Sequence, residues 1–483
     1  MPLPLPAAGR PGPPPAAPLP WIMACLSLVV LLASLATSIA NVGLPTFMRV
    51  FDAPFNAIQW VVLSYLLAVT TFVVSAGRLA DILGRRHLML AGIAVFTLAS
   101  IACAAARELW VLVAARAAQG LGAAVMMALA MAVITDAVPR ERVGRAMGLL
   151  GTMSAIGTAL GPPLGGALVA SLGWQSIFLV NLPPGLVALG LAYRHLPARR
   201  GAADRPSFDF AGSALLAVTL GAYALTMTLG RSSPAAARAA WACAALCGLV
   251  LFLYAESRIR APLLRPALLR QPVVGSGLAM SSLVTTVVMA TLVVGPFYLG
   301  GALHLDTAAT GLVMSAGPLV AALAGMPAGR AVDRFGAART TAWGLAFMGA
   351  GCLALSLLPP AFGIWGYIGP LVTLTAGFAG FQAANNTAVL QGVEAGQRGV
   401  VSGLLNLSRN LGLISGASAM GAVFTSTAGS VDLVSAAPDA IAAGTRATFA
   451  AGAGCIAVAL GLAMRASRRF RQATPLAATG TAR

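Results

Sequence analysis

Long apolar runs occupy most of this sequence, and they restrict the chain to very few folds. Fourteen runs can be placed, each close to the roughly 20 residues that a helix needs to cross a bilayer. Backbone polar groups find no water inside a bilayer, and the runs are about twice as long as a barrel strand, so helices are expected. We predict an all-α membrane protein whose fourteen spans are residues 21–43, 57–76, 88–106, 110–134, 145–171, 175–193, 210–230, 239–256, 273–298, 309–328, 339–358, 364–388, 400–424 and 446–465.

The composition agrees with a membrane protein. Of the 483 residues, 58% are hydrophobic and only 9% are charged, too few to cover a soluble surface. The net charge of +18 comes from arginine without any lysine, and the basic residues are scattered over loops, which argues against nucleic acid as a partner. With the N-terminus inside, the inner segments hold 24 arginines and the outer loops hold five, namely Arg49, Arg107, Arg231, Arg238 and Arg446. We therefore expect a multi-pass protein of the plasma (inner) membrane with both termini in the cytoplasm.

A charged turn occurs twice between predicted spans. The spacing of Gly77, Asp81 and Gly84 recurs in Gly329, Asp333 and Gly336. This repetition predicts two similar halves related by an axis along the membrane normal, with a cavity between them. The expected plan is a disordered proline-rich cytoplasmic tail (1–20), a six-helix bundle (21–195), cytoplasmic loops with two linker helices (196–272), a second six-helix bundle (273–465) and a basic cytoplasmic tail (466–483).

The turn and the six-two-six plan resemble the major facilitator superfamily, and within it the fourteen-helix drug:proton antiporter family. The stretch Gly77–Arg86, which ends in Gly84-Arg85-Arg86, matches the superfamily's loop signature. We interpret it as a gating latch: Asp81 is expected where the following helix begins, near helix N-terminal amides and arginines, and the glycines permit close approach and a tight turn. The alternative is a simple topology signal. In the second copy Ala337 and Ala338 replace the two arginines, which predicts a weaker latch.

Two arginines, Arg116 and Arg409, fall inside predicted spans. An arginine there costs at least about 2.5 kcal/mol on insertion scales, so each marks a functional site by default. The sequence Arg116-Ala-Ala-Gln119-Gly resembles a second superfamily signature, which implies that Arg116 takes part in proton transfer or in tuning nearby groups; the alternative is a structural arginine bonded to backbone carbonyls. For Arg409 the structural interpretation is favoured.

The span 145–171 contains a motif that resembles a signature of antiporters. Its members are Gly157, Gly161, Pro162, Gly165 and Gly166. Glycines four residues apart let a partner helix approach closely, and a proline removes one helix hydrogen bond and allows a bend. The resemblance implies export, whereas the residues alone would indicate ordinary small-residue packing.

The carboxylates do not fit proton coupling well. The stretch 208–212 resembles the fourteen-helix group, but Ala36 stands where members commonly have an aspartate. All thirteen carboxylates and the three histidines fall in loops or at helix ends, and a proton-coupled pump needs a buried group that titrates. Asp136 and Asp81 remain as candidates, although loop stabilisation is the favoured role of both. We therefore predict weak, indirect or absent proton coupling, while the resemblance implies proton antiport.

The expected substrate cavity is lined by polar and aromatic residues of facing helices. The candidates are Ser38, Asn41, Tyr65, Gln119, Phe297, Tyr298, Gln382, Asn385 and Asn406. Each is equally a candidate for helix packing, because amides and hydroxyls also join helices. A cavity with two arginines and no acid suits neutral, zwitterionic or anionic amphiphiles better than dications. The six cysteines fall in apolar runs and are expected in the core, without a metal site.

These patterns predict a secondary active transporter that exports small amphiphilic compounds or drugs by alternating access, as a proton antiporter if the resemblance holds. The alternatives are a dedicated exporter of one metabolite or siderophore-like compound, and a uniporter without proton coupling. No metalloprotease, serine-hydrolase or nucleotide-loop motif occurs in the sequence, so we expect neither an enzyme nor a cofactor. The expected partners are a small-molecule substrate, protons and the bilayer, with the chain as a monomer.

Overall fold

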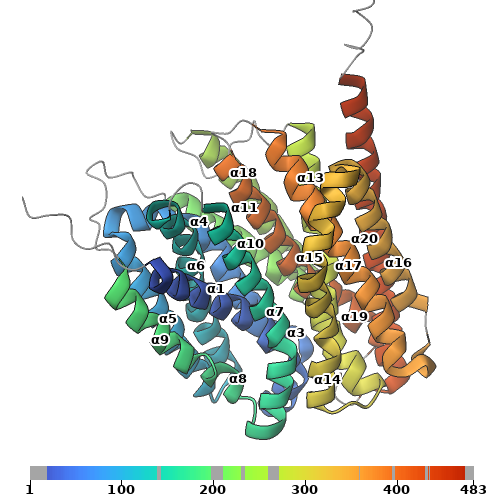
Figure 1. The fold of residues 1–483 in the computed structure, drawn as a ribbon. Coiled ribbons are helices and arrows are strands. Elements are labelled where there is room, and N and C mark those ends of the chain that lie inside the picture. Colours follow the sequence, from blue (N-terminus) through green and yellow to red (C-terminus); the bar gives the residue numbers. More distant parts are fainter. Residues whose placement is uncertain are drawn as a thin grey trace, which may run out of the picture.

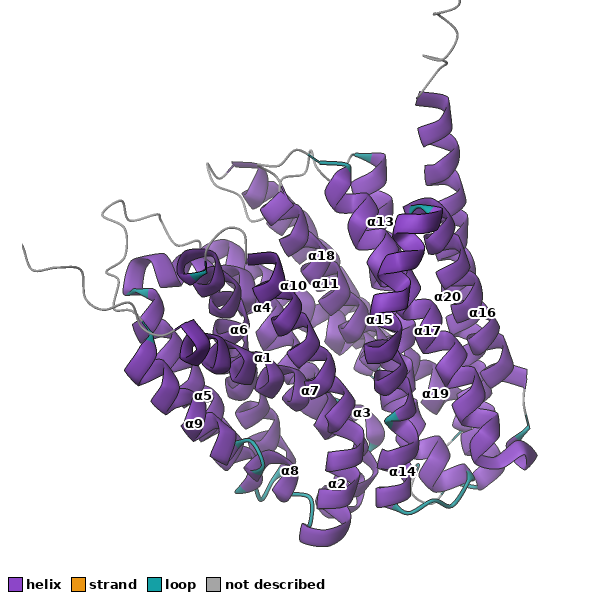
Figure 2. Cartoon of the chain, viewed as in Figure 1, coloured by secondary structure: helices purple, strands orange, loops and turns teal. Residues whose placement is uncertain are grey.

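The computed structural model describes residues 19–138, 143–196, 210–229, 234–258, 271–357, 359–393, 398–429, 433 and 436–473. All regular structure within these ranges is helical, as predicted (Figure 2). The proline-rich tail up to residue 18, Phe208, Asp209 and the basic tail from residue 474 lie outside the described residues.

The helices fall into two groups, which lie on the left and on the right of Figure 1. The first group consists of α1 (Leu19–Val42), α2 (Leu44–Phe51), α3 (Phe55–Ile58), α4 (Trp60–Leu83), α5 (Arg85–Ala104), α6 (Leu109–Ala137), α7 (Val143–Leu172), α8 (Ser176–Leu179) and α9 (Leu182–His195). The second consists of α13 (Pro272–Phe297), a π-helical turn (Tyr298–Ala302), α14 (Thr307–Met314), α15 (Ala316–Phe335), α16 (Ala337–Leu357), a 3-10 turn (Pro360–Phe362), α17 (Gly363–Gln391), α18 (Arg398–Ser415), a second π-helical turn (Gly416–Met420), α19 (Gly421–Ala428) and α20 (Pro438–Ala473).

The lengths and surfaces of the helices suit a bilayer. In the described part of the chain, thirteen helical stretches are long and apolar enough to cross a membrane. The predicted span 210–230 is occupied by α10 (Phe210–Thr228), whose apolar stretch is shorter. Large apolar side chains face outward, such as Leu98, Leu357 and Trp365, and a surface of this kind requires lipid around it. The chain is therefore a multi-pass membrane protein.

The linker helices α10 and α11 (Ala235–Arg258) pack against each other beside the two groups. Helix α10 contacts α4, and its Tyr223 hydroxyl lies 2.8 Å from the Ser415 hydroxyl of α18, within hydrogen-bonding distance. Helix α11 is largely exposed, so the prediction that Cys243 and Cys247 are core residues is wrong: both side chains are exposed on its surface.

Helices that start at opposite ends of the molecule alternate along the chain. We call the end where α1 begins and α20 ends the inner end, and the opposite end the outer end. The arginine distribution predicts that the inner end is cytoplasmic.

Candidate functional site

In both copies of the charged turn, a single glycine separates two consecutive helices, and the turn is not a loop. Helix α4 continues through the predicted loop to Leu83, and α5 follows directly after Gly84, which has φ 87°. The second copy has the same geometry, since α15 ends at Phe335 and Gly336 has φ 83°. Glycine adopts this left-handed region without a Cβ penalty, so the repeated sequence produces a repeated backbone turn.

The position predicted for the acidic residue of this turn is wrong. Asp81 lies in the last turn of α4 and Asp333 in the last turn of α15, because each helix runs past the aspartate to the glycine. The side chain of Asp81 is outside the described residues, and so is that of Asp136 near the end of α6. The latch remains a prediction.

The arginines of the first copy bind within the first half. The Arg85 Nη1 atom donates to the Ala132 carbonyl of α6 at 3.0 Å. The Arg86 Nη2 atom donates to the Tyr193 carbonyl of α9 at 2.5 Å, and its guanidinium lies 5.5 Å from the centre of that tyrosine ring. These bonds hold the start of α5 against α6 and α9.

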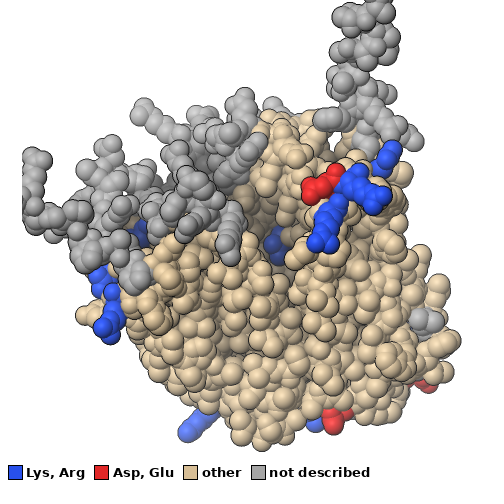
Figure 3. Space-filling view, viewed as in Figure 1, with Lys and Arg blue, Asp and Glu red and all other residues tan. Residues whose placement is uncertain are grey.

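Glycines near the inner end face open space. A Cβ atom added at Gly77 or Gly329 would meet no described atom within 4 Å, and the same holds for Gly148 and Gly151 of α7. The close approach predicted for Gly77 is therefore not made in this conformation. The space-filling view is hollowed between the two halves toward the inner end, and basic atoms are visible in the hollow (Figure 3).

The antiporter motif packs α7 against α1 within the first half. A Cβ atom at Gly157 would lie 2.5 Å from the Leu31 carbonyl oxygen, and one at Gly161 would overlap the Ser38 hydroxyl. A Cβ atom at Gly165 would lie 2.9 Å from a side-chain carbon of Ile39. The predicted backbone approach is present, and α1 is the partner helix.

The last glycine of the motif contacts the second half. A Cβ atom at Gly166 would lie 2.6 Å from the Thr307 carbonyl oxygen and 3.0 Å from the Cα atom of Gly311 on α14. A Cβ atom at Gly311 would overlap the carbonyl oxygen of Pro162, which lies inside α7. The outer ends of the two halves thus meet backbone to backbone.

Further contacts join the halves at the outer end. The Gln59 Nε2 atom donates to the Ala417 carbonyl at 2.7 Å, and Gln59 is buried. The Phe55 ring lies 5.0 Å from that of Phe297 and 6.0 Å from that of Phe424, edge to face in both pairs. These distances are favourable for aromatic pairs, so an apolar cluster and a buried hydrogen bond add to the glycine contact.

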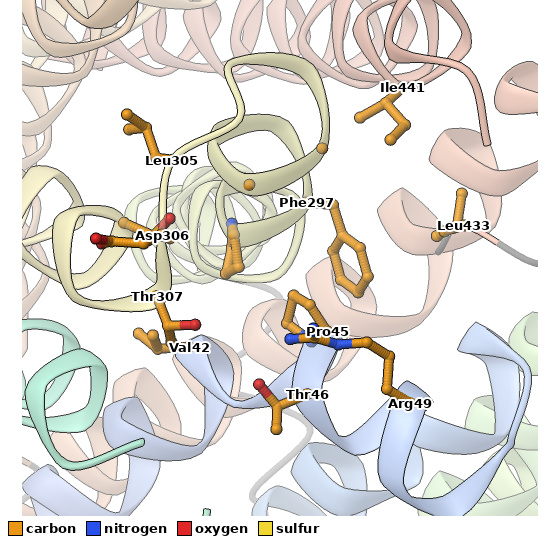
Figure 4. Close-up of a pocket in the computed structure, with 14 residues that line it drawn as sticks. Val42, Pro45, Thr46, Arg49, Phe297, Leu305, Asp306, Thr307, Leu433 and Ile441 are labelled. Atoms are coloured by element: carbon orange, nitrogen blue, oxygen red, sulfur yellow. The ribbon is translucent and has the colours of Figure 1, made fainter. Parts of the chain in front are cut away.

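A cavity of about 430 Å³ remains at the outer end between the halves. Figure 4 shows Thr46 and Arg49 of the first half and Phe297 and Asp306 of the second around it. Both charged residues are exposed, and the Asp306 carboxylate caps α14 by accepting from the Ala309 amide at 2.6 Å. Phe297 is the one predicted cavity residue among those that line this space.

Arg116 is sealed inside the first half. Its side chain is fully buried, its Nε atom donates to the Val61 carbonyl at 2.9 Å, and its Nη1 atom donates to Gln119 Oε1 at 2.6 Å. The guanidinium lies over the Tyr65 ring, 4.3 Å from its centre, while Nη2 has no hydrogen-bond partner among the described residues. Gln119 in turn donates to the Ser100 hydroxyl at 2.7 Å. Within the described residues, a carbonyl, an amide and an aromatic ring stabilise this cation without a carboxylate.

Arg409 has a different environment. It lies on α18 and is partly exposed, and its Nε atom is buried without a hydrogen-bond partner in the described part of the chain. The bonding to the protein expected of a structural arginine is not seen there.

The other predicted cavity residues are mostly satisfied by the protein. The Tyr65 hydroxyl donates to the Ala33 carbonyl at 2.8 Å, and the Asn385 Nδ2 atom donates to the Gly277 carbonyl at 3.1 Å. The buried members are Ser38, Asn41, Tyr65, Gln119, Phe297, Tyr298 and Asn385, whereas Gln382 is half-buried and Asn406 is exposed. Substrate contact by any of them stays a prediction.

Sequence reasoning missed the residues that join the halves. None of Gln59, Gly311, Arg49 and Asp306 was expected to lie between the halves. Each acts through a partner that is distant in the sequence, so no local spacing could have identified it.

The comparisons with known proteins agree with this fold. A sequence model of the Major Facilitator Superfamily matches residues 26–417. The chain belongs to the Major Facilitator Superfamily. It is 32% identical over 390 residues to the multidrug resistance protein Stp of Mycobacterium tuberculosis (strain CDC 1551 / Oshkosh), which covers 80% of this chain and 72% of that protein. It is 29% identical over 393 residues to the riboflavin transporter RibZ of Clostridioides difficile (strain 630), which covers 81% of this chain and 85% of that one.

The fold is also that of a solved transporter. A bacterial homolog to the human lysosomal transporter Spinster, in an inward-facing and occupied conformation, superposes with a TM-score of 0.70 at 16% sequence identity, over 96% of this chain and 100% of that one. This chain therefore shares the fold of that transporter, in agreement with its membership of the superfamily.

Proposed function

We propose that this chain exports small amphiphilic compounds across the plasma (inner) membrane by alternating access. One observation carries the proposal: the halves touch at the outer end through Gly166 and Gly311, while Gly148 and Gly329 at the inner end face open space. A chain that is sealed outside and hollowed inside is in one of the two conformations that alternating access requires.

The antiparallel packing of two helices supports a second conformation in which the inner end is closed. Helices α7 and α15 run in opposite directions, so 18 residues back from Gly166 and 18 residues on from Gly311 lead to Gly148 and Gly329. A tilt that separates the outer pair brings the inner pair together, and glycines at both positions allow close contact. On this basis the second copy of the charged turn closes the inner end.

The names of relatives favour export of drugs but leave a second candidate. A multidrug resistance protein is among them, and the antiporter motif agrees with outward transport. A riboflavin transporter is also among them, which favours the alternative of one dedicated metabolite. Transport as a monomer with both termini in the cytoplasm belongs to the same proposal.

We further propose that proton coupling is weak, indirect or absent. The carboxylates in the described helices and caps, for example Asp333 and Asp439, lie within one turn of a helix end. Ala36, where the family commonly has an aspartate, is fully buried. Arg116 has no acidic partner in the described residues with which to exchange a proton.

Inverted membrane vesicles test export and coupling together. A pH-sensitive dye inside the vesicles reports an imposed proton gradient, and cationic, neutral and anionic amphiphiles are added in turn while their uptake is measured. We expect uptake of at least one amphiphile with little or no dye recovery. Strong substrate-induced recovery that disappears in Arg116→Ala but persists in Arg339→Ala, an exposed arginine on α16, would overturn the coupling proposal. Absence of uptake for every compound would count against export.

A further inference from the structure

Arg409 is a cation placed well inside a membrane span. The span of which α18 is part begins at Val401, and eight residues at a rise of 1.5 Å bring Arg409 about 12 Å into it. Its Nε atom is buried, so part of the guanidinium has left water. A charge at this depth is expected to face a cavity or the bundle interior and to have a partner.

The protein does not supply that partner within the described residues. Nε of Arg409 makes no hydrogen bond, and the described carboxylates lie at helix ends and caps. Arg116 is the informative comparison, because the same residue type in the other half is fully buried and bonded to a carbonyl and an amide. Arg116 is therefore fully buried and held by the protein, whereas Arg409 is partly exposed and its buried Nε has no partner among the described residues.

The side of α18 that carries Arg409 is polar. Ser408 and Gly412 face α13, since the Ser408 hydroxyl donates to the Leu278 carbonyl and a Cβ atom at Gly412 would overlap backbone of that helix. Arg409 follows the exposed residues Ser402 and Asn406 at helical spacing, so the three lie on one stripe. A stripe of serine, asparagine and arginine is unfavourable toward lipid, so we expect it to face the hollow between the halves.

The neighbouring helix adds polar groups. Helix α17 contacts α18, and its Gln382 and Asn386 are both partly exposed. Amides donate and accept hydrogen bonds but carry no charge. The side of α18 that carries Arg409, together with these residues of α17, thus combines a guanidinium that has an unbonded Nε with neutral polar side chains.

We infer that Arg409 binds the anionic group of the transported compound and makes the carrier selective for amphiphilic anions such as carboxylates or sulfonates. The inference rests on the proposed export function. Because Nε is buried, the two Nη atoms form the end of the guanidinium that binds a carboxylate through two parallel hydrogen bonds. A solute carboxylate provides the acceptors that the described residues of the chain do not place there.

The test uses three probes with one aromatic body: 1-naphthaleneacetate, the neutral 1-naphthaleneacetamide and 1-naphthylmethyl-trimethylammonium. Binding to the purified full chain in nanodiscs is measured by calorimetry, with empty nanodiscs as the blank. The wild type is expected to bind the carboxylate at least tenfold more tightly than the amide, and the cation most weakly. Arg409→Gln should remove the preference for the carboxylate and leave the affinity for the amide within about twofold. Arg409→Lys should retain part of the preference, because the ammonium keeps the positive charge but lacks the paired N–H donors of a guanidinium.

Arg339→Gln is the matched control, since it removes the same charge from an exposed position on α16. It should leave all three affinities unchanged. Equal loss of carboxylate and amide binding in Arg409→Gln would overturn the inference in favour of a structural role. If that variant does not fold, a wild type without preference for the carboxylate overturns the inference by itself. Vesicle uptake of the neutral amide separates the two proposals: uptake without anion preference refutes the role of Arg409 and leaves export intact.

Discussion

Gly166→Ala tests the outer seal directly, because its Cβ atom would press on backbone of the other half. That atom would lie 2.6 Å from the Thr307 carbonyl oxygen and 3.0 Å from the Cα atom of Gly311. Backbone cannot rotate away as a side chain can, so α14 has to move away from α7 (Figure 1). Overpacking of this kind costs about 1–3 kcal/mol. Only the outward-closed conformation contains the contact, so the equilibrium should shift toward outward-open by about 5- to 150-fold.

The assay is the labelling rate of a reporter cysteine at the outer cavity. Thr310 lines this cavity and is 4% exposed, so Thr310→Cys in a background without the six native cysteines should react slowly with a membrane-impermeant maleimide from outside. Adding Gly166→Ala should raise the rate in proportion to the outward-open population.

Two neighbouring glycines provide matched controls. Gly165→Ala crowds Ile39 of α1 within the same half, so it should lower stability in both conformations without raising the labelling rate. Gly148→Ala adds a methyl group to open space in this conformation and would crowd the proposed contact with Gly329 only in the outward-open one, so it should not raise the labelling rate. If Gly166→Ala leaves the rate unchanged, or if Gly165→Ala raises it equally, the seal is not formed as described.

Three more substitutions give separate readouts. Gln59→Leu removes the hydrogen bond to the Ala417 carbonyl between the halves, worth about 1 kcal/mol, and should raise the same labelling rate about fivefold; no change would mean that the bond is dispensable for closure. Arg116→Met leaves the Gln119 oxygen without its donor and should lower the free energy of unfolding in denaturant by about 2–4 kcal/mol, so an unchanged midpoint would contradict a structural role. Tyr223→Phe removes the hydroxyl contact between α10 and α18 and should cost about 1 kcal/mol of stability with normal labelling, whereas faster labelling would place α10 in the gate.

Much of the fold follows from local sequence features. Apolar runs of about 20 residues predicted the spans, because length and hydropathy act on each segment alone. The repeated turn was predicted at the correct glycines, Gly84 and Gly336, since positive φ depends on one residue. The helix ends were less accurate: α4 extends past Gly77 to Leu83, because a polar last turn that leaves the bilayer remains helical.

The candidate site was only partly predictable. The motif Gly157–Gly166 predicted close packing correctly. Some of its glycines contact α1 and one contacts α14, however, and the regular spacing of the glycines does not show which partner helix each one meets. Likewise, Arg116 and Arg409 are both arginines inside apolar runs. The sequences around them do not indicate that one guanidinium is fully buried and that the other is partly exposed.

The sequence by itself therefore determined the helices, the repeated turn and the scarcity of acids inside the membrane, because each depends on residue type and short-range spacing. Tertiary structure decided which end is closed, which glycine touches the other half and which arginine is fully buried with hydrogen bonds to described residues. Those properties depend on contacts between residues more than 100 positions apart, such as Gly166 with Gly311 and Gln59 with Ala417, and such contacts exist only after the two halves have packed together.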